Sequence, residues 1–169
     1  SSDLALFAIM VLRQRNKVSE EKKRSDRLLL NILPLETAEE LKSSGSAKAK
    51  YFEQVTVMFT DFKNFTRIAE HLSPEELVKE IHYCYTAFDA IVKQHGVEKI
   101  KTIGDAYMCA AGLPVANTTH AADMLRAAIA IRDFMAQEKK IREESGKPFF
   151  EIRIGIHTGP VVAGVVGAH

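Results

Sequence analysis

A tight hairpin in the middle of the chain is the sequence feature that most constrains the fold. Two strand-like runs, Val97 to Ile103 and Ala106 to Ala111, flank the dipeptide Gly104-Asp105, and this pattern predicts two antiparallel strands joined by a two-residue turn. A helical pattern lies on each side of the hairpin, and a further strand pattern lies at each end. The order strand, helices, hairpin, helix, strand predicts a ferredoxin-like β-α-β-β-α-β domain, an α+β fold with one antiparallel sheet.

The segments before the hairpin carry clear boundary signals. The apolar and β-branched run Gln54 to Thr60 predicts a buried strand that ends at Asp61. Ser73-Pro74-Glu75-Glu76 predicts a helix start with a capping box and proline at the first helical position. The apolar positions of that helix recur at intervals of three or four, which predicts one buried face: Leu77, Ile81, Cys84, Phe88 and Ile91.

The segments after the hairpin complete the pattern. Thr118 or Thr119 is expected to cap the next helix. The apolar positions of this helix are Leu125, Ala128, Ile129, Ile131 and Met135. Phe150 to His157 predicts the last strand, and the glycine-rich segment from His157 to Gly167 is expected to form a turn.

Composition excludes several classes of protein. The 169 residues are 46% hydrophobic and 27% charged, which is typical of globular domains and excludes collagen, a low-complexity linker and a chain disordered throughout. The formal net charge of +1 gives no indication of a nucleic-acid partner, and we expect none. The two cysteines, Cys84 and Cys109, have no metal-type spacing, so a disulfide framework is not predicted and a reducing compartment is favoured.

The first fifty residues are not predicted to be globular. The apolar run Leu4 to Leu12 is followed at once by the charged stretch Arg13 to Arg27, as at the cytoplasmic end of a transmembrane helix. We therefore expect residues 1–12 to be the end of such a helix, most of which would lie upstream, because so short a run cannot span a bilayer. The alternative is an apolar helix start that packs on its dimer mate.

A long helix is predicted to follow. Neither glycine nor proline interrupts residues 1–33, and apolar residues partly follow a heptad pattern, which indicates a parallel coiled coil between two protomers; the alternative is a solvated charged helix. Pro34 would end or bend this helix, and Thr37 to Lys42 is expected to form a short helical turn. Residues 13–50 are thus expected to connect protomers and transmit state between them, and residues 51–169 to form the globular domain.

Two aspartates are predicted to meet at one edge of the sheet. Asp61 closes the first strand and Asp105 opens the third, and these strands are antiparallel neighbours in a ferredoxin-like sheet. Converging carboxylates share a divalent cation, act as an acid/base pair, or are unrelated turn residues. The pair favours Mg²⁺, which is usually held by one or two carboxylates plus substrate phosphates. The segment Phe62 to Thr66 leads into a helix N-terminus that suits phosphate oxygens, so phosphoryl or nucleotidyl transfer is expected.

Three ordered motifs resemble the class III adenylyl/guanylyl cyclase catalytic domain. They are Phe59-Thr-Asp-Phe-Lys-Asn-Phe-Thr66, Lys99-Ile-Lys-Thr-Ile-Gly-Asp-Ala-Tyr-Met108 and Arg153-Ile-Gly-Ile-His-Thr-Gly-Pro-Val-Val-Ala-Gly-Val-Val-Gly167. The resemblance implies that Asp61 and Asp105, with the backbone carbonyl of Phe62, bind two Mg²⁺ or Mn²⁺ ions. It also implies that the backbone around Asn64, Phe65 and Thr66 holds the triphosphate. One metal would then activate the ribose 3′-hydroxyl, and the second would stabilise the leaving pyrophosphate.

The purine base of the substrate is predicted from Lys101. In this family the residue four positions before the hairpin aspartate contacts the purine edge. An ammonium only donates hydrogen bonds, which suits the N1 acceptor of adenine, whereas guanylyl-type domains carry glutamate there. Lys101 therefore predicts ATP as substrate and an adenylate cyclase that makes 3′,5′-cyclic AMP, with a guanylate cyclase as the alternative. Lys99 is expected to face the same way and to be a plain surface lysine, unless a slip in register exchanges the two.

The resemblance also implies partners. Because Asp61, Asp105 and Lys101 are all present on one chain, we expect a parallel homodimer with two composite sites. Residues 13–50 resemble the signalling helix and transducer linker that precede this domain in receptors of the family. The resemblance therefore implies the output domain of a membrane-anchored signalling receptor, with its catalytic domain in the cytoplasm.

The last expectation concerns the motifs that follow these three in the family. They include a second purine contact, a ribose-orienting Asn and a transition-state Arg, and the sequence has no match to them before His169. The domain is therefore expected to be C-terminally incomplete, and the chain as given to be inactive or nearly so. The alternative of a different class is a non-catalytic dimerisation or regulatory module with a cyclase-like fold.

Overall fold

The computed structural model describes residues 17–24, 35–44 and 48–164 of the chain. The chain divides into two units, residues 1–47 and 48–169. In the first unit, residues 17–24 are helical and helix α2 spans Leu35–Ser44, so it is longer than the predicted turn from Thr37 to Lys42. The apolar segment 1–12 and Pro34 lie outside the described residues, and the continuous long helix stays a prediction. None of the helices in the described ranges has the length and apolar character needed to cross a membrane.

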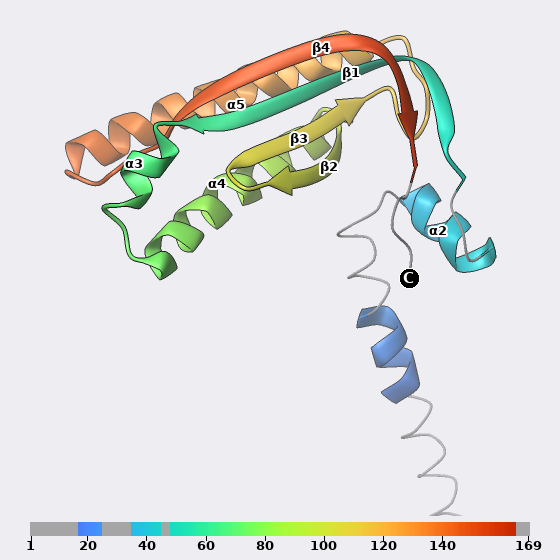
Figure 1. Ribbon diagram of the computed structural model, residues 1–169, viewed down its shortest axis with the longest axis horizontal. Helices are drawn as coiled ribbons and strands as arrows, with labels where there is room; N and C mark the ends of the chain where they lie inside the picture. The colour runs from blue at the N-terminus through green and yellow to red at the C-terminus, as the bar shows by residue number, and fades with distance from the viewer. Residues whose placement is uncertain (1–16, 25–34, 45–47, 165–169) are drawn as a thin grey trace, which may run out of the picture. The chain divides into compact units, whose positions relative to one another are not determined.

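The second unit has the predicted ferredoxin-like topology. Its elements are β1 (Lys50–Lys63), α3 (Phe65–Ala69), α4 (Pro74–Gln94), β2 (Glu98–Ile103), β3 (Ala106–Ala111), α5 (His120–Glu144) and β4 (Glu151–Ala163). The strands form one sheet in the order β2-β3-β1-β4, and each neighbouring pair is antiparallel, as Figure 1 shows. The α+β fold class and the hairpin around Gly104-Asp105 are thereby confirmed.

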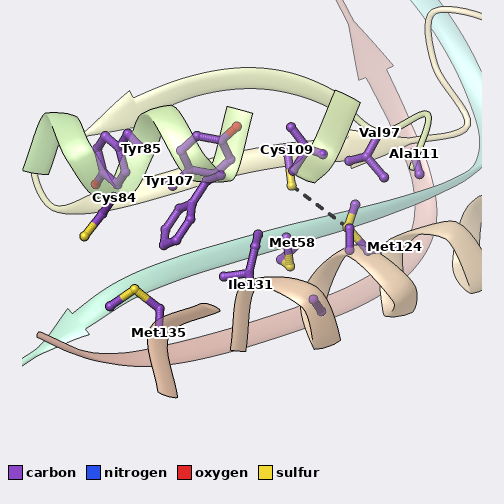
Figure 2. Packing of buried hydrophobic residues seen from close by; sticks show 14 of the residues in the cluster. Met58, Cys84, Tyr85, Val97, Tyr107, Cys109, Ala111, Met124, Ile131 and Met135 are labelled. Carbon is purple, nitrogen blue, oxygen red and sulfur yellow. Dashed lines mark hydrogen bonds between the residues drawn. The ribbon is translucent and has the colours of Figure 1, made fainter. Parts of the chain in front are cut away.

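Strand alternation gives the sheet two chemically different faces. Met58 and Phe62 of β1, with Tyr107 and Cys109 of β3, are buried against residues of α4 and α5 in one cluster. Figure 2 shows Met124, Ile131 and Met135 of α5 in this cluster. We call this side the helix face. Residues of opposite parity, such as Phe59, Asp61, Met108 and Arg153, point the other way, and we call that side the outer face.

The start of α4 follows the predicted chemistry. The Ser73 side chain accepts a hydrogen bond from the backbone N–H of Glu76, and the Glu76 carboxylate accepts one from the Ser73 backbone N–H. This hydrogen bond to the Ser73 backbone holds the pKa of the Glu76 carboxyl below its usual value. Cys84 and Phe88 are buried, while Leu77, Ile81 and Ile91 pack on the core from its edge, so the predicted apolar face is confirmed.

Helix α5 begins after the predicted cap residue, but its buried stripe includes positions that the sequence pattern did not single out. Thr119 is its N-cap residue, but the Thr119 side chain makes no capping bond to the backbone and instead donates to the Asp123 carboxylate at 2.6 Å. Leu125 and Ile129 are 53% and 49% exposed, so these two of the named apolar positions lie on the outside of the helix. Met124 and Ala127, which the pattern did not single out, are buried.

Strands β1 and β4 are longer than expected. Strand β1 continues past Asp61, because Phe62 and Lys63 still pair with β4. Strand β4 runs through Ala163, and His157, which was expected to lie in a glycine-rich turn, is an exposed strand residue opposite Val57. The glycine-rich segment is therefore a strand as far as Ala163 rather than a turn.

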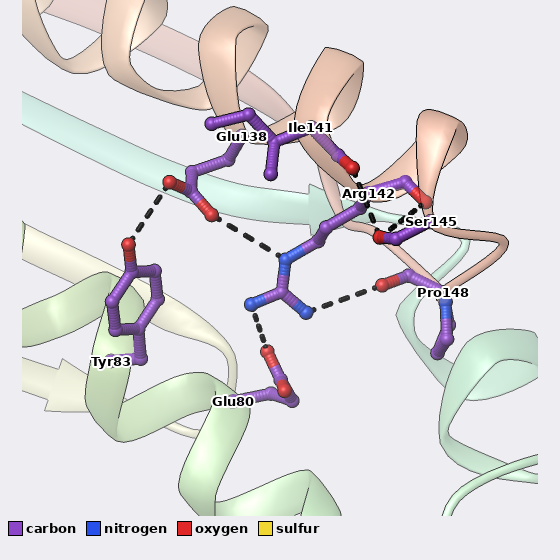
Figure 3. A network of polar contacts seen from close by, with 7 residues as sticks. All are labelled: Glu80, Tyr83, Glu138, Ile141, Arg142, Ser145 and Pro148. Atoms are coloured by element: carbon purple, nitrogen blue, oxygen red, sulfur yellow. Dashed lines mark hydrogen bonds and ion pairs between the residues drawn. The ribbon is translucent and has the colours of Figure 1, made fainter.

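A polar network joins the two long helices to the start of β4. The Arg142 guanidinium of α5 contacts the carboxylates of Glu80 and Glu138, and it donates to the backbone carbonyl of Pro148 at 3.3 Å. Figure 3 shows Arg142 at the centre of this network, with Tyr83 bound to Glu138. The network ties α4 and α5 together at the end of the unit where β4 begins.

Candidate active site

The register of β1 and β3 places Asp61 and Asp105 at the same end of neighbouring strands. Thr60 lies opposite Tyr107; Asp61 follows Thr60, and Asp105 comes just before β3 in the hairpin turn. Both aspartates are partly exposed. Gly104 beside Asp105 has φ +60°, a conformation that L-residues with side chains rarely adopt. The turn that carries Asp105 therefore depends on this glycine.

Arg153 of β4 contacts Asp61 across the outer face. Asp61 and Arg153 are paired residues of β1 and β4. The guanidinium donates two hydrogen bonds to the Asp61 carboxylate, from Nε at 2.7 Å and from Nη2 at 2.8 Å. This bond and the Asp61 charge raise the pKa of Arg153, and the more distant charge of Asp105 acts in the same direction. The charges of Asp61 and Asp105 therefore both act on the Arg153 guanidinium.

Whether this site suits a divalent cation depends on which side chains it offers as metal ligands. Within residues 17–24, 35–44 and 48–164, no group of three or more His, Cys, Asp or Glu side chains comes together as a complete metal cage. Mg²⁺ needs no such cage, because it is usually held by one or two carboxylates together with substrate phosphates and water. Asp61 and Asp105 fit that requirement with the substrate supplying the remaining oxygens. The Arg153 guanidinium must share or release the Asp61 oxygens for such an ion to bind.

The segment after Asp61 is held by aromatic packing. The Phe62 ring is 2% exposed and stacks on Phe150 with ring centroids 4.7 Å apart. The Phe65 ring lies 6.3 Å from that of Phe62 and 5.8 Å from that of Phe150. Asn64 between them adopts a left-handed conformation with φ 57° and is the N-cap of the short helix α3. The two rings thus fix the backbone of the turn, while Asn64 and Thr66 remain exposed.

One buried hydroxyl near the site lacks a partner. The Tyr85 ring stacks between Phe62 and Tyr107, with centroid distances of 5.9 and 5.4 Å. Its hydroxyl has no hydrogen-bond partner among the residues that the structure describes. Burial raises the pKa of Tyr85 far above its usual range, and the negative charge of Asp105 adds to this effect. Tyr85 therefore connects the core electrostatically to the hairpin turn.

Lys101 and Lys99 do not face the same way, so that expectation was wrong. Lys99 lies opposite Cys109, whereas Lys101 lies opposite Met108. The extra residue between them, Ile100, is a β-bulge, which reverses the alternation of the strand. Lys101 is exposed on the outer face, and Lys99 points to the helix face, where its ammonium contacts Asp89 of α4 at 2.8 Å.

Sequence reasoning missed the roles of three residues near the site. Arg153 was quoted in a motif but given no role; a basic residue opposite Asp61 becomes apparent only when the pairing of β1 and β4 is known. Asp89 and Tyr107 form a hydrogen bond of 2.8 Å between α4 and β3. Their positions in sequence gave no signal of this contact, because it depends on how the helix packs on the sheet.

The comparisons with known proteins agree on one type of domain. The family model described as the adenylate and guanylate cyclase catalytic domain matches residues 47–169. Retinal guanylyl cyclase 1 of Homo sapiens is 43% identical over 159 residues, which is 93% of this chain and 14% of that protein. Atrial natriuretic peptide receptor 2 of Homo sapiens is 42% identical over 149 residues, 88% of this chain and 14% of that protein. The chain thus spans about a seventh of the length of these relatives.

Solved structures with the same fold include domains of both cyclase types. A dimeric guanylyl cyclase domain of the RhoGC fusion protein from Blastocladiella emersonii has a TM-score of 0.63 and 35% identity, covering 72% of this chain and 66% of that one. The catalytic core of a rhodopsin-guanylyl cyclase with converted specificity, in complex with ATPαS, has a TM-score of 0.64 at 35% identity, covering 72% and 64%. The adenylyl cyclase CyaB from P. aeruginosa has a TM-score of 0.66 at 27% identity, covering 72% and 63%.

Proposed function

Because this chain belongs to the family of adenylate and guanylate cyclase catalytic domains, we propose that it cyclises a purine nucleoside triphosphate to the 3′,5′-cyclic nucleotide and releases pyrophosphate. The observation that carries the proposal is the arrangement of Asp61 and Asp105. They lie at adjoining ends of β1 and β3, and the Arg153 guanidinium contacts Asp61 on the outer face.

The two aspartates hold the metal ions in this proposal. Asp61 and Asp105, with the Phe62 backbone carbonyl, supply oxygen ligands, and divalent ions there would lower the pKa of the 3′-hydroxyl and offset the charge of the leaving group. The buried Phe62 ring keeps its carbonyl in place. From the sequence motifs, we assign two metal ions, Mg²⁺ or Mn²⁺, to each site.

The turn that follows would bind the triphosphate. The backbone N–H groups around Asn64, Phe65 and Thr66 lie at the start of α3, where N–H groups have no partner within a helix. The left-handed conformation of Asn64 and the packing of the Phe65 ring hold this backbone in one shape. A preorganised turn of this kind binds phosphate oxygens without first having to order itself.

Two observations support different purines. One of the relatives reported above is named a guanylyl cyclase, and solved guanylyl cyclase domains are among the structural neighbours, so the comparisons favour the guanylate alternative over the adenylate interpretation. GTP is therefore the substrate that relatedness supports. Relatedness at this level does not fix the base, since one neighbour at 35% identity is described as having converted specificity and was solved with ATPαS.

ATP is the second candidate, and Lys101 is the specific observation in its favour. Lys101 is exposed on the outer face, opposite Met108. Its ammonium offers only hydrogen-bond donors, which match the N1 acceptor of adenine and oppose the N1–H donor of guanine. A donor facing a donor is strongly disfavoured in a site that excludes water.

The deciding experiment measures products from both nucleotides. The full-length protein is incubated with ATP or GTP and with Mg²⁺ or Mn²⁺, and cyclic nucleotides are separated by chromatography. Cyclic GMP as the main product would support GTP, and cyclic AMP would support ATP. Formation of neither product would refute the cyclase proposal and favour a non-catalytic dimerisation or regulatory module.

The assembly belongs to the same proposal. We infer a homodimer with two composite sites, in which the aspartates of one protomer and Lys101 of its partner meet. The relatives include a protein named as a receptor, which supports a signalling role for residues 13–50. A membrane anchor through residues 1–12 and a cytoplasmic catalytic domain remain part of this proposal. Sedimentation equilibrium across a range of concentrations tests the dimer.

A further inference from the structure

The Tyr85 hydroxyl is a hydrogen-bond donor without a partner. Tyr85 is 9% exposed, and its hydroxyl oxygen is buried with no hydrogen-bond partner among the residues that the structure describes. A buried polar group that makes no bond destabilises the fold, and native proteins contain few such groups. Phenylalanine would fill the same space without this penalty, so packing alone does not account for the hydroxyl.

Three aromatic neighbours fix the position of this hydroxyl. The ring centroids of Phe62, Phe88 and Tyr107 lie 5.9, 5.9 and 5.4 Å from that of Tyr85, and all three of these residues are buried. The hydroxyl lies on the long axis of its ring, so a flip of the ring does not move the oxygen. The donor therefore occupies one defined position in the core.

The Tyr85 ring packs between residues that adjoin the two candidate metal ligands. Phe62 follows Asp61 directly, and Tyr107 is the second residue after Asp105. Figure 2 shows the Tyr85 and Tyr107 rings next to each other. Because two residues of chain span at most about 7 Å, these ring contacts bring Tyr85 close to the site from its core side.

Among the described carboxylates around this position, Asp105 is the one that accepts no hydrogen bond. Asp89, one helical turn from Tyr85 on α4, accepts a bond from the Tyr107 hydroxyl at 2.8 Å. Both oxygens of Asp61 accept bonds from the guanidinium on β4 that faces them. Within residues 17–24, 35–44 and 48–164, no group donates a hydrogen bond to the Asp105 carboxylate. Asp105 therefore retains the full capacity of its oxygens to accept bonds.

The charge of Asp105 acts on the Tyr85 hydroxyl. Burial raises the pKa of Tyr85 far above its usual range, and the negative charge of Asp105 raises it further. An effect of this kind falls with distance, so the carboxylate is a near neighbour of the hydroxyl, although the two are not hydrogen-bonded to each other. The hydroxyl stays protonated, and an unpaired donor thus lies near an unpaired acceptor.

A divalent ion at Asp105 would favour a bond between these two groups. Asp105 is partly exposed in the hairpin turn, so its carboxylate is solvated by water when no cation is bound. An ion displaces part of this water, and a hydrogen bond to a protein donor is stronger where water is excluded. Carboxylates that bind metals are usually oriented by such bonds, and loss of the bond weakens metal binding by about 10-fold to 100-fold.

We propose that Tyr85 is a positioning residue, whose hydroxyl donates a hydrogen bond to the Asp105 carboxylate when the site holds metal. The bond orients the carboxylate from the core side and leaves its other lone pairs to the cation. Tyr85 itself contacts neither the metal nor the nucleotide. The inference rests on the proposed function, because the metal-binding role of Asp105 belongs to that proposal.

Metal affinity tests the inference with a readout other than activity. Mn²⁺ is titrated by EPR into the full-length protein with the natural sequence and with Tyr85→Phe, in the absence of nucleotide. The Kd for Mn²⁺ is expected to rise by about tenfold or more in Tyr85→Phe. The midpoint of urea unfolding without metal should not fall, because the hydroxyl has no partner to lose in that state. A Kd within about twofold of the natural value would overturn the proposal.

A second tyrosine on the same helix provides the matched control. The Tyr83 hydroxyl, two residues earlier on α4, donates to Glu138 of α5 at 2.9 Å, so Tyr83→Phe removes a hydroxyl that is bonded elsewhere. This variant should leave the Kd for Mn²⁺ unchanged. A rise in Kd in Tyr85→Phe that is accompanied by a lower unfolding midpoint without metal would show general loosening of the core, and the positioning role would then be wrong.

Asp105→Ala separates failure of this inference from failure of the proposed function. If Asp105→Ala leaves the Kd for Mn²⁺ unchanged, Asp105 is not a metal ligand, and the metal assignment of the proposed function fails together with the role of Tyr85. If Asp105→Ala weakens Mn²⁺ binding but Tyr85→Phe does not, the role of Tyr85 alone is refuted. Weaker binding in both variants, with Tyr83→Phe unchanged, is the result that we expect.

Discussion

Arg153 and Asp61, 92 residues apart in sequence, form a two-point ion pair across neighbouring strands, with both nitrogen–oxygen distances below 3 Å. The pair places a fixed cation on one of the two carboxylates that we assign to metal binding. A divalent ion and a guanidinium that both require the Asp61 oxygens must compete for them or share them. The affinity of the site for metal is therefore set partly by Arg153.

Replacing Arg153 should tighten metal binding in the absence of nucleotide. Arg153→Gln removes the competing charge, and we expect the Kd for Mn²⁺ to fall by about threefold to tenfold, since a partly exposed pair contributes about 1 kcal/mol. Titration calorimetry or Mn²⁺ EPR measures this. Arg132→Gln is the matched control, because Arg132 makes the same kind of contact with Asp133 on α5. An unchanged or weaker affinity for Arg153→Gln would contradict the competition.

Removing either aspartate should abolish cyclisation. Asp61→Ala or Asp105→Ala in the full-length protein is expected to lower kcat by about a thousandfold or more, because a metal ion supplies several kcal/mol of transition-state stabilisation. Circular dichroism should show an intact fold, as neither carboxylate is part of the buried core. Asp133→Ala, on the exposed side of α5, should retain activity. Near-normal turnover in either site variant would remove that aspartate from the metal assignment.

Exchanging the charge at position 101 should change the choice of purine. Lys101→Glu replaces a donor with an acceptor, which suits the N1–H and amino group of guanine, so the ratio of kcat/KM for ATP to that for GTP should fall by about tenfold or more. Lys147→Glu makes the same change of charge on an exposed residue after α5 and should leave the ratio unchanged. A ratio that is equal in the two variants would mean that Lys101 does not contact the base.

Two neighbouring tyrosines should respond oppositely to loss of the hydroxyl. Tyr107→Phe removes the donor to Asp89, and we expect it to lower the free energy of unfolding by about 1–2 kcal/mol. Tyr85→Phe removes a hydroxyl without a partner among the described residues, so stability should be unchanged or slightly higher. Urea denaturation of the two variants measures the difference. The opposite order would show that the Tyr85 hydroxyl, rather than that of Tyr107, carries the stabilising bond.

The two thiols should be protected from alkaline ionisation by burial. Burial raises the pKa of Cys84 from 9.0 to about 11 and that of Cys109 to about 12. Because the folded-state values exceed the unfolded value, this contribution to stability is present below pH 9 and is lost as the pH rises through 11 and 12. At pH 8 the folded chain should react with DTNB far more slowly than the chain in urea. Equal rates would mean that the thiols are open to solvent.

Much of the fold could be predicted from local chemistry. The capping box at Ser73 and the hairpin around Gly104-Asp105 are encoded within a few residues, and both are confirmed. Thr119 is confirmed as the N-cap residue of α5, although its hydroxyl donates a hydrogen bond to the Asp123 carboxylate and accepts none from the helix backbone. Local patterns therefore define the elements, but not every contact at their ends.

The site was predictable only as far as strand order determines it. The positions of Asp61 and Asp105 follow from the topology, but the ion pair of Asp61 with Arg153 depends on the register of β1 and β4. The orientation of Lys101 depends on a bulge at Ile100 that becomes apparent only in the pairing of β2 with β3. Both features are set by contacts between elements far apart in sequence.

Phe62 has a consequence for the engineering of this domain. Its ring is part of the core beside Phe65, Tyr85 and Phe150, while its main chain lies between Asp61 and the turn at Asn64, which we propose to bind metal and phosphate. Substitutions that repack the core around this ring, for example to raise thermostability, would therefore also move the backbone atoms that we assign to metal and phosphate binding. Thermostability and turnover would thus both depend on the position of Phe62. Selection for either property is expected to act through compensating substitutions at the surrounding aromatic residues.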